Sequence, residues 1–196
     1  MKLTIKNQES YSRLELLLRT FFGWLYIAIP HGFLLFFISI WSLILMFLAF
    51  WAVLFTARYP KSFFEFQAGF FRWNLRLTAR LYNLSDGYPA FGIKGTDEYT
   101  NLDIPYPEKL SRGLLILRVL FGWLYVMIPH GFILFFRGIA TAVVIFIAWW
   151  IVLFTGKYPL SLHNFVTGTV RWGTRINLYI YFMTDAYPPF TGKDID

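Results

Sequence analysis

The sequence contains no cysteine, and only 15% of its 196 residues are charged. The absence of cysteine excludes disulfide bonds and thiolate metal sites. Soluble domains usually carry about a quarter charged residues, whereas this chain is 57% hydrophobic and 22% aromatic. Catalytic motifs are missing too, because there is no nucleophile elbow, no glycine-rich phosphate loop and no H-E-x-x-H sequence. We therefore expect no enzyme, no catalytic residue and no metal site.

Charge is absent from two long stretches in particular. No acidic or basic side chain occurs from Phe21 to Thr56, and the run from Val119 to Thr155 is broken only by His130 and Arg137. Both runs exceed the ~20 residues that cross a bilayer, which predicts an integral membrane protein. The net charge of +7 then indicates anionic membrane lipids, and not nucleic acid, as the partner.

The chain repeats itself. The stretch "FGWLYIAIPHGFLLFF" from Phe22 returns as "FGWLYVMIPHGFILFF" from Phe121, an offset of 121 − 22 = 99. The same offset aligns "WAVLFTARYP" with "WIVLFTGKYP" and "DGYPAF" with "DAYPPF". Such self-similarity predicts a tandem duplication, with repeat 1 at residues 1–99 and repeat 2 at residues 100–196.

The apolar runs are long enough for a hairpin in each repeat. Arg118 and Arg137 bracket an uncharged segment of about 27 Å as a helix, which matches a ~30 Å hydrocarbon core. Gly138 in repeat 2, and Ser39 to Ser42 in repeat 1, would then form the turns. The predicted fold class is an all-α membrane protein whose four transmembrane helices form two hairpins, roughly at 20–38, 41–56, 119–137 and 139–155.

This hairpin topology predicts the location of the chain. It places every basic residue except Arg137 on one face of the membrane, and the positive-inside rule makes that face cytoplasmic. We therefore expect a multi-pass protein of the bacterial cytoplasmic (inner) membrane with both termini in the cytoplasm.

An amphipathic helix is expected after each hairpin, at about 62–84 and 161–184. Basic residues recur on one side of these segments and aromatic residues on the other, as in helices that lie in the membrane interface. One interpretation is simple anchoring by arginine and tryptophan, and the other is a lipid or phosphate site, because guanidinium groups bind phosphate bidentately. The candidate residues are Arg72, Arg76, Arg80, Arg171, Arg175, Trp73 and Trp172.

Short alternating segments precede the apolar runs. Leu3 and Ile5 in "KLTIK" match Leu102 and Ile104 in "NLDIP". This pattern predicts small β-strands near residues 2–6 and 101–105, which would pair with each other across the repeats.

The I-P-H-G motif places polar groups inside an apolar helix. Pro30 removes a backbone donor and frees the carbonyl of Tyr26, to which His31 is able to donate, while Gly32 permits a neighbouring helix to approach. A structural kink is one interpretation, and an ion or proton path along the repeat axis is another. A third is a b-type haem held between His31 and His130. The equivalent residues in repeat 2 are Pro129, His130 and Gly131.

The combination of "YPEKLSR", "IPH", "LFTGKYP", "RW" and "YPPF" in repeat 2 resembles an uncharacterised family of bacterial membrane proteins, catalogued as a domain of unknown function. Its members carry one or two copies of the unit. Repeat 1 departs from the pattern at Ala57, where the family has glycine, and at Ala90. The resemblance implies a fold and a membrane location, and it implies no activity, cofactor or partner.

These observations favour a non-enzymatic membrane protein, a scaffold or accessory subunit that binds lipid headgroups or a larger membrane assembly through a basic, aromatic cytoplasmic face. The expected partners are anionic membrane lipids, with other membrane proteins or self-association in addition. A small transporter or channel-like protein is the alternative, and a haem-binding subunit is the third. No cofactor is expected in the first interpretation, and haem b only in the third.

Overall fold

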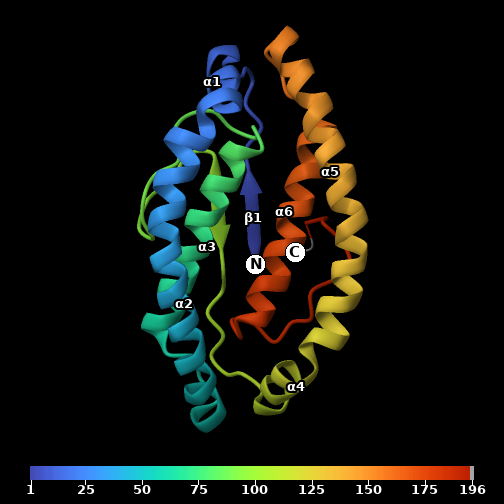
Figure 1. The fold of residues 1–196 in the computed structure, drawn as a ribbon. Helices are drawn as coiled ribbons and strands as arrows, with labels where there is room; N and C mark the ends of the chain where they lie inside the picture. Colours follow the sequence, from blue (N-terminus) through green and yellow to red (C-terminus); the bar gives the residue numbers. More distant parts are fainter. Residues whose placement is uncertain (195–196) are drawn as a thin grey trace.

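A computed structural model describes residues 1–194 and is predominantly helical (Figure 1). Repeat 1 contains β1 (Lys2–Ile5), α1 (Arg13–Gly23), the π-helical turn η1 (Trp24–Ala28), α2 (Ile29–Thr56) and α3 (Lys61–Leu81). Repeat 2 contains β2 (Thr100–Asp103), α4 (Arg112–Gly122), η2 (Trp123–Met127), α5 (Ile128–Thr155) and α6 (Leu160–Ile180). The bounds of equivalent helices differ by 99 residues throughout, as in Arg13 and Arg112.

The predicted hairpins are wrong. The segments from Arg13 to Thr56 and from Arg112 to Thr155 each form one unbroken helix of 44 residues. Ser39, at the expected turn, lies within α2 and donates its hydroxyl to Phe36 O. The expected turn at Gly138 lies within α5. Each long helix is apolar and long enough to cross a membrane.

Arg137 explains why the hairpin prediction failed in repeat 2. Its charge was expected to mark the membrane surface, but the side chain lies against α6 instead. Arg137 Nε donates to Thr169 Oγ1 at 2.9 Å, and the guanidinium carbon lies 4.5 Å from the centre of the Phe165 ring. An arginine with such partners is tolerated in mid-helix, because its donors are hydrogen-bonded and its flat face packs on an aromatic ring.

Both long helices begin and end in the same way. Ser12 and Ser111 are N-caps, and their hydroxyl oxygens accept from Glu15 N and Leu114 N. Serine is favoured there because its oxygen satisfies an amide that has no partner within the helix. At the other end, Ala57 and Gly156 adopt the left-handed conformation, with φ of 58° and 71°.

The two strands confirm the predicted pairing and define the symmetry of the molecule. β1 and β2 form an antiparallel two-stranded sheet in which Leu3 pairs with Leu102, its own equivalent in the other repeat. A two-fold axis therefore passes between these two residues and relates the repeats. Both leucines are buried, at 0% and 2% exposure.

The long helices run antiparallel, and each begins where the other ends (Figure 1). At the first end of the molecule, Arg13 donates to Phe154 O and Tyr11 N donates to Gly156 O. The second end repeats these contacts, with Arg112 donating to Phe55 O and Leu110 N donating to Ala57 O. The axis is therefore perpendicular to the long helices.

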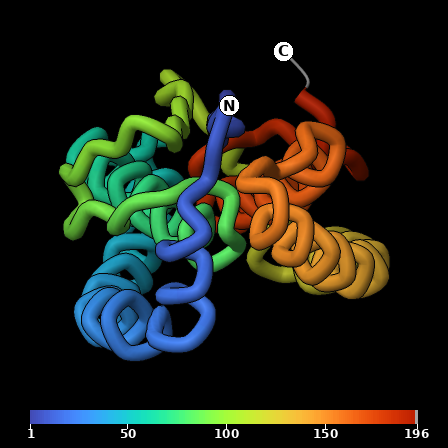
Figure 2. Tube along the Cα trace, turned by 90° about the horizontal axis from the view of Figure 1, so that it is seen from above, coloured from blue at the N-terminus to red at the C-terminus, as the bar shows by residue number. Residues whose placement is uncertain are grey.

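The molecule has two layers, seen along the long helices in Figure 2. In this view both long helices lie in the lower half, α2 at the left and α5 at the right, and the N-terminus and much of the segment between the repeats lie in the upper half. Between them, α3 packs on α2 and α6 packs on α5. We call the long helices the apolar layer, and α3, α6, the strands and the connecting segments the polar layer. One hydrophobic core joins both repeats and includes Leu16, Ala49, Leu115 and Ala148.

The helices predicted at 62–84 and 161–184 exist as α3 and α6, but they lie at the centre of the molecule. Much of α3 is buried, including Phe64, Gln67, Trp73 and Arg76. In α6 the buried residues include Trp172 and Arg175. Both tryptophans and three of the arginines, Arg76, Arg80 and Arg175, thus face the protein interior.

Candidate functional site

Three motifs of the sequence meet at one place in repeat 1. His31 on α2, Trp73 on α3 and Phe91 in the segment after α3 form a compact cluster. Trp73 Nε1 donates to His31 Nδ1 at 2.9 Å, and the Phe91 ring stacks on the imidazole at 3.9 Å with an interplanar angle of 4°. The I-P-H, R-W and Y-P-x-F motifs are therefore parts of one site.

Repeat 2 contains the same cluster. Trp172 Nε1 donates to His130 Nδ1 at 2.9 Å, and Phe190 stacks on that imidazole at 4.0 Å and 4°. We call the two clusters the histidine clusters. Such close agreement in two sequence-related copies indicates that the local sequence specifies the arrangement.

The proline of each motif leaves one backbone carbonyl without a donor in the helix, and a tyrosine hydroxyl donates to that carbonyl. Pro30 has no amide hydrogen, so the carbonyl of Tyr26 loses its helical partner. Tyr88 Oη donates to Tyr26 O at 3.0 Å. In repeat 2, Tyr187 Oη donates to Tyr125 O at 2.8 Å. The sequence predicted the freed carbonyl correctly, but the predicted donor, the neighbouring histidine, is wrong.

The hydrogen bond from tryptophan determines the protonation state of each histidine. An indole N–H is only a donor, so Nδ1 of His31 and of His130 must be an acceptor. A protonated imidazole has no acceptor, and both rings are therefore neutral with the proton on Nε2. His130 Nε2 donates to Tyr187 Oη at 3.2 Å. His31 Nε2 has no hydrogen-bond partner among residues 1–194.

The glycines of the motif have a different environment from the one predicted. Outside the glycine's own stretch of helix, no atom of residues 1–194 lies within 4 Å of a Cβ built on Gly32 or on Gly131. No helix within residues 1–194 therefore makes the predicted close approach at these glycines, and both positions are exposed.

The two histidines are not brought together. Each imidazole contacts aromatic rings of its own repeat, which are Trp73, Tyr88 and Phe91 for His31. Within residues 1–194, no group of three or more histidine, aspartate or glutamate side chains is placed to hold a metal ion. The repeat axis passes between Leu3 and Leu102, which are both buried.

The predicted lipid-binding arginines of α3 are engaged within the protein. Arg76 is 2% exposed and donates to three carbonyls of the segment after α3, and Arg80 forms an ion pair with Asp97 at 2.6 Å. Arg72 Nε donates to Leu102 O at 2.9 Å. The carbonyls that Arg76 contacts belong to Ala90, Gly92 and Gly95.

The arginines of α6 have the same kind of partners. Arg171 donates to Leu3 O and Gly192 O, and Arg175 donates to Thr191 O and Lys193 O. Arginine provides five donors in one plane, which suits it to hold a turn of backbone carbonyls. Headgroup binding by these arginines stays a prediction, and their visible role is to fasten the segments that follow α3 and α6.

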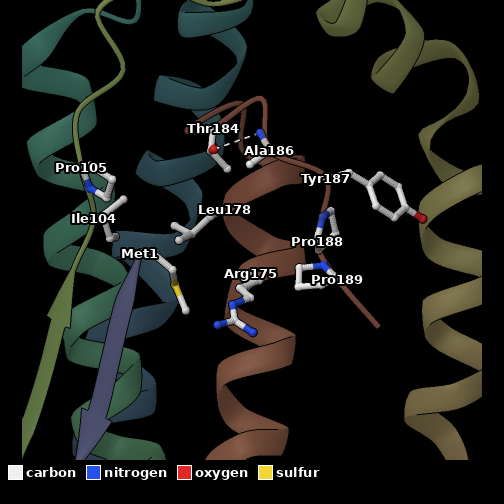
Figure 3. A pocket seen from close by; sticks show the side chains of 10 residues that line it. All are labelled: Met1, Ile104, Pro105, Arg175, Leu178, Thr184, Ala186, Tyr187, Pro188 and Pro189. Atoms are coloured by element: carbon white, nitrogen blue, oxygen red, sulfur yellow. Dashed lines mark hydrogen bonds between the residues drawn. The ribbon is translucent and has the colours of Figure 1, made fainter. Parts of the chain in front are cut away.

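A cavity of about 340 Å³ lies beside Arg175, between the strands and the Y-P-P-F turn (Figure 3). Met1, Ile104 and Leu178 supply apolar walls, and the ring of Tyr187 points away from it toward α5. The charged residue of its lining is thus held by the turn after α6, and the cavity is largely apolar.

The sequence interpretation missed an ion pair of a buried arginine in each repeat. Asp86 accepts from Arg19 Nη2 at 2.7 Å and from Ser12 N at 2.6 Å, which links the start of α1 to the segment after α3. Arg118 and Asp185 form the equivalent pair in repeat 2, and Asp185 accepts from Ser111 N. The signal was available, because both pairs are conserved between the repeats as arginine and aspartate 67 residues apart.

Burial and hydrogen bonding act in opposite directions on Asp97. Burial alone raises the pKa of its carboxyl group, but hydrogen bonds from Arg80 and Thr100 and the charge of Arg80 outweigh it, so the pKa lies below its ordinary value. Asp97 is therefore ionised and part of the clamp on α3.

Exposed basic residues gather at the two ends of the long helices. The second end carries Arg58, Lys109 and Arg112, which line a shared groove with Glu108. At the first end, the exposed basic residues are Arg13 and Lys157. We call these the basic ends. They adjoin the apolar layer directly, because they flank its first and last turns.

Comparison with known proteins identifies the second repeat. Residues 116–192 match a domain of unknown function (DUF4389). The family recognised from the motifs is thereby confirmed as an uncharacterised one. This range contains the whole histidine cluster of repeat 2, from His130 to Phe190. No curated protein and no solved structure matches the chain.

Proposed function

We propose that the protein is a non-enzymatic membrane protein, a lipid-bound scaffold or accessory subunit whose long helices are embedded in lipid and whose basic ends bind anionic headgroups. One observation carries the proposal, namely the apolar character of the exposed surface of the long helices. Phe33 and Phe55 are 64% and 71% exposed, and their equivalents Phe132 and Phe154 are 68% and 71% exposed. Contiguous apolar surface of this kind is typical of a membrane contact.

The chemistry of the remaining residues supports a binding role. Asp86, Asp97 and Asp185 each accept from an arginine, and the histidines have their Nδ1 atoms occupied by tryptophan. Groups held in this way are positioned for packing and not for proton transfer to a substrate. The histidine clusters then serve to fix α3 and α6 against the long helices.

The basic ends supply the preference for anionic lipid. A lysine or arginine near an anionic membrane surface contributes about 1 kcal/mol of binding free energy. Because the basic ends adjoin the apolar layer, their side chains reach the headgroups when the long helices contact acyl chains. No role in binding is required of the arginines that hold the segments after α3 and α6.

The test compares two triple variants with the same change in charge. In R58Q/K109Q/K157Q the substitutions lie at the basic ends, and in K6Q/K94Q/K193Q they lie in the polar layer. All six side chains are exposed. The anionic lipid that co-purifies with each protein in mild detergent is measured by mass spectrometry. In the first variant, the preference for anionic over neutral lipid is expected to fall by a factor of at least about ten.

The control variant is expected to keep most of that preference. An equal loss in both variants would reduce the effect to net charge and would refute binding at the basic ends. A protein that stays in solution without detergent or lipid would refute the membrane contact itself.

A further inference from the structure

The polar layer runs alongside the apolar layer and does not sit at its ends. Two contacts in repeat 1 place α3 beside the middle of α2, because Trp73 bonds His31 and Gln67 bonds Ser42. The sheet lies on the outer side of α3, where Arg72 donates to Leu102 O. Polar groups therefore occur at half the length of the long helices.

Several exposed residues of this layer are charged. On α3 they include Glu65 and Arg72, and on the strands they include Lys2 and Asp103. If the long helices crossed the membrane along their own axis, these groups would lie at the depth of the hydrocarbon, where a charged side chain costs several kcal/mol. That orientation is therefore strongly unfavourable.

The length of the long helices leads to the same conclusion. The uncharged segment from Phe21 to Thr56 measures about 54 Å as a helix, against a hydrocarbon core of ~30 Å. To fit across the bilayer it would need a tilt of roughly 55°, beyond the 0–40° observed for transmembrane helices.

The long helices also lack the polar side that a surface-bound helix has. In α2 the buried residues form one narrow stripe toward α3, which includes His31, Leu35, Leu45 and Val53. Around the rest of the helix the large exposed residues are apolar, among them Ile29, Phe33, Phe37, Trp41, Phe47 and Phe55. Such a helix needs hydrocarbon on all sides that the protein does not cover.

One orientation satisfies all these demands, and it rests on the proposed function. We propose that both long helices lie parallel to the membrane plane, submerged in the acyl chains of a single leaflet, with the polar layer above them in water. Both basic ends then reach headgroups of the same leaflet. The two-fold axis through Leu3 and Leu102 is parallel to the membrane normal, so the two repeats enter the leaflet in the same way.

This orientation also accounts for the placing of the long helices and of the polar segments on different sides of the molecule. Seen along the long helices, α2 and α5 both lie in the lower half of the view, at its left and right, and the N-terminus and much of the segment between the repeats lie in the upper half (Figure 2). The occupant of the apolar layer is thus lipid of one leaflet, and the opposite leaflet is not crossed.

Single cysteines test the orientation, because the native chain has none. Two symmetry-related pairs are informative. Glu9 and Glu108 are exposed at opposite ends of the molecule, and Ile40 and Ile139 are exposed in the middle of the long helices. The full-length variants E9C, E108C, I40C and I139C are expressed in cells, and right-side-out and inverted membrane vesicles are treated with a membrane-impermeant thiol reagent.

The in-plane orientation predicts that E9C and E108C react from the same side, at least about tenfold faster than from the other, and that I40C and I139C react from neither. Reaction of E9C and E108C from opposite sides would overturn it in favour of a spanning orientation. Reaction of I40C and I139C from the side opposite to E9C would overturn it in favour of two hairpins.

A carbonate wash of the same vesicles separates this proposal from the proposed function. Protein that remains in the membrane fraction but labels in a spanning pattern refutes the orientation alone. Protein that the wash removes refutes membrane embedding, and with it both proposals. T96C, in the exposed segment between the repeats, serves as the labelling control and is expected to react from the same side as E9C.

Discussion

The two repeats share a backbone arrangement but differ in how they satisfy the same polar demands. In both, a tryptophan donates to the histidine and a tyrosine donates to the carbonyl that the proline frees. Only in repeat 2 does the tyrosine also accept from the histidine, through His130 Nε2 and Tyr187 Oη. The carbonyl that the proline frees therefore accepts from a tyrosine in both repeats, and repeat 2 adds one hydrogen bond between the histidine and that tyrosine.

The link between each long helix and its inner helix differs more. In repeat 1, Ser42 and Gln67 exchange two hydrogen bonds at 2.6 and 2.7 Å. In repeat 2, Thr141 and Arg137 both contact Thr169. The equivalent hydroxyl residues Ser42 and Thr141 thus make a polar contact at this depth in both repeats, but with unrelated partners on the inner helix, Gln67 and Thr169. The comparison teaches that the site of the contact matters more for the fold than its chemistry, and four predictions test this view.

The largest difference is expected for the buried ion pairs. In D185A, Arg118 loses the only carboxylate that contacts it within residues 1–194, so the free energy of unfolding should fall by about 3–5 kcal/mol. In D86A, Arg19 keeps its ion pair with Glu15, and the loss should be smaller by about 1 kcal/mol. Denaturant unfolding in detergent measures both. Equal losses would show that Glu15 does not compensate.

The second difference concerns the tyrosines. Y187F removes the donor to Tyr125 O and the acceptor for His130, whereas Y88F removes only the donor to Tyr26 O. Each lost hydrogen bond at a buried group costs about 1–2 kcal/mol, so Y187F should destabilise the protein more than Y88F by about 1 kcal/mol. Unfolding midpoints give the comparison, and Y82F, at an exposed position after α3, is the control. A larger loss for Y88F would contradict it.

The helix ends provide a reciprocal pair of substitutions. Ala57 adopts a left-handed backbone conformation that glycine adopts at lower cost, and Gly156 occupies the equivalent position. A57G should stabilise repeat 1 by about 0.5–1 kcal/mol, and G156A should destabilise repeat 2 by a similar amount. Thermal unfolding of the two variants measures these effects. Changes of the same sign in both would exclude the backbone explanation.

The smallest effect is a dependence of stability on pH at His163, a position where only repeat 2 has a histidine. Burial lowers the pKa of His163 below its ordinary value, although its hydrogen bond to Leu84 O opposes the shift. The unfolded chain therefore binds the proton more readily, and stability should decline as pH falls through about 6.5, the unfolded pKa.

Repeat 1 has Phe64 at the equivalent position, which suggests the variant for this measurement. Between pH 7.5 and 6.0, His163 should contribute a loss of at most about 0.8 kcal/mol, since a single group titrates there. H163F should show a smaller decline over this range than the native protein. An unchanged decline would assign the pH dependence to other groups.

Much of the fold followed from local sequence. The duplication, the strands around Leu3 and Leu102 and the position of α3 and α6 were predicted, because periodicity and self-similarity report on segments of this length. The freed carbonyl of Tyr26 was also predicted, because Pro30 has no amide hydrogen to donate to it. Its donor, Tyr88, was not, because the two residues are 62 positions apart and only folding brings them together.

The hairpin prediction failed for a related reason. A long apolar segment satisfies the requirements of two short helices as well as those of one long helix, and a charge such as Arg137 indicates a membrane surface only if no partner lies within the protein. Thr169 and Phe165 on α6 are such partners. Their proximity depends on the packing of α6 against α5.

The sequence by itself determined that this is a duplicated chain with long apolar segments, because composition and period depend on covalent order alone. It also determined the contents of the histidine clusters, since their motifs recur in both copies. Only the tertiary structure decided that the long helices are unbroken and antiparallel, and that the arginines of α3 and α6 face backbone carbonyls. Helix direction and the partner of a buried charge depend on contacts between distant segments, and the free energy of those contacts is absent from any local stretch of the chain.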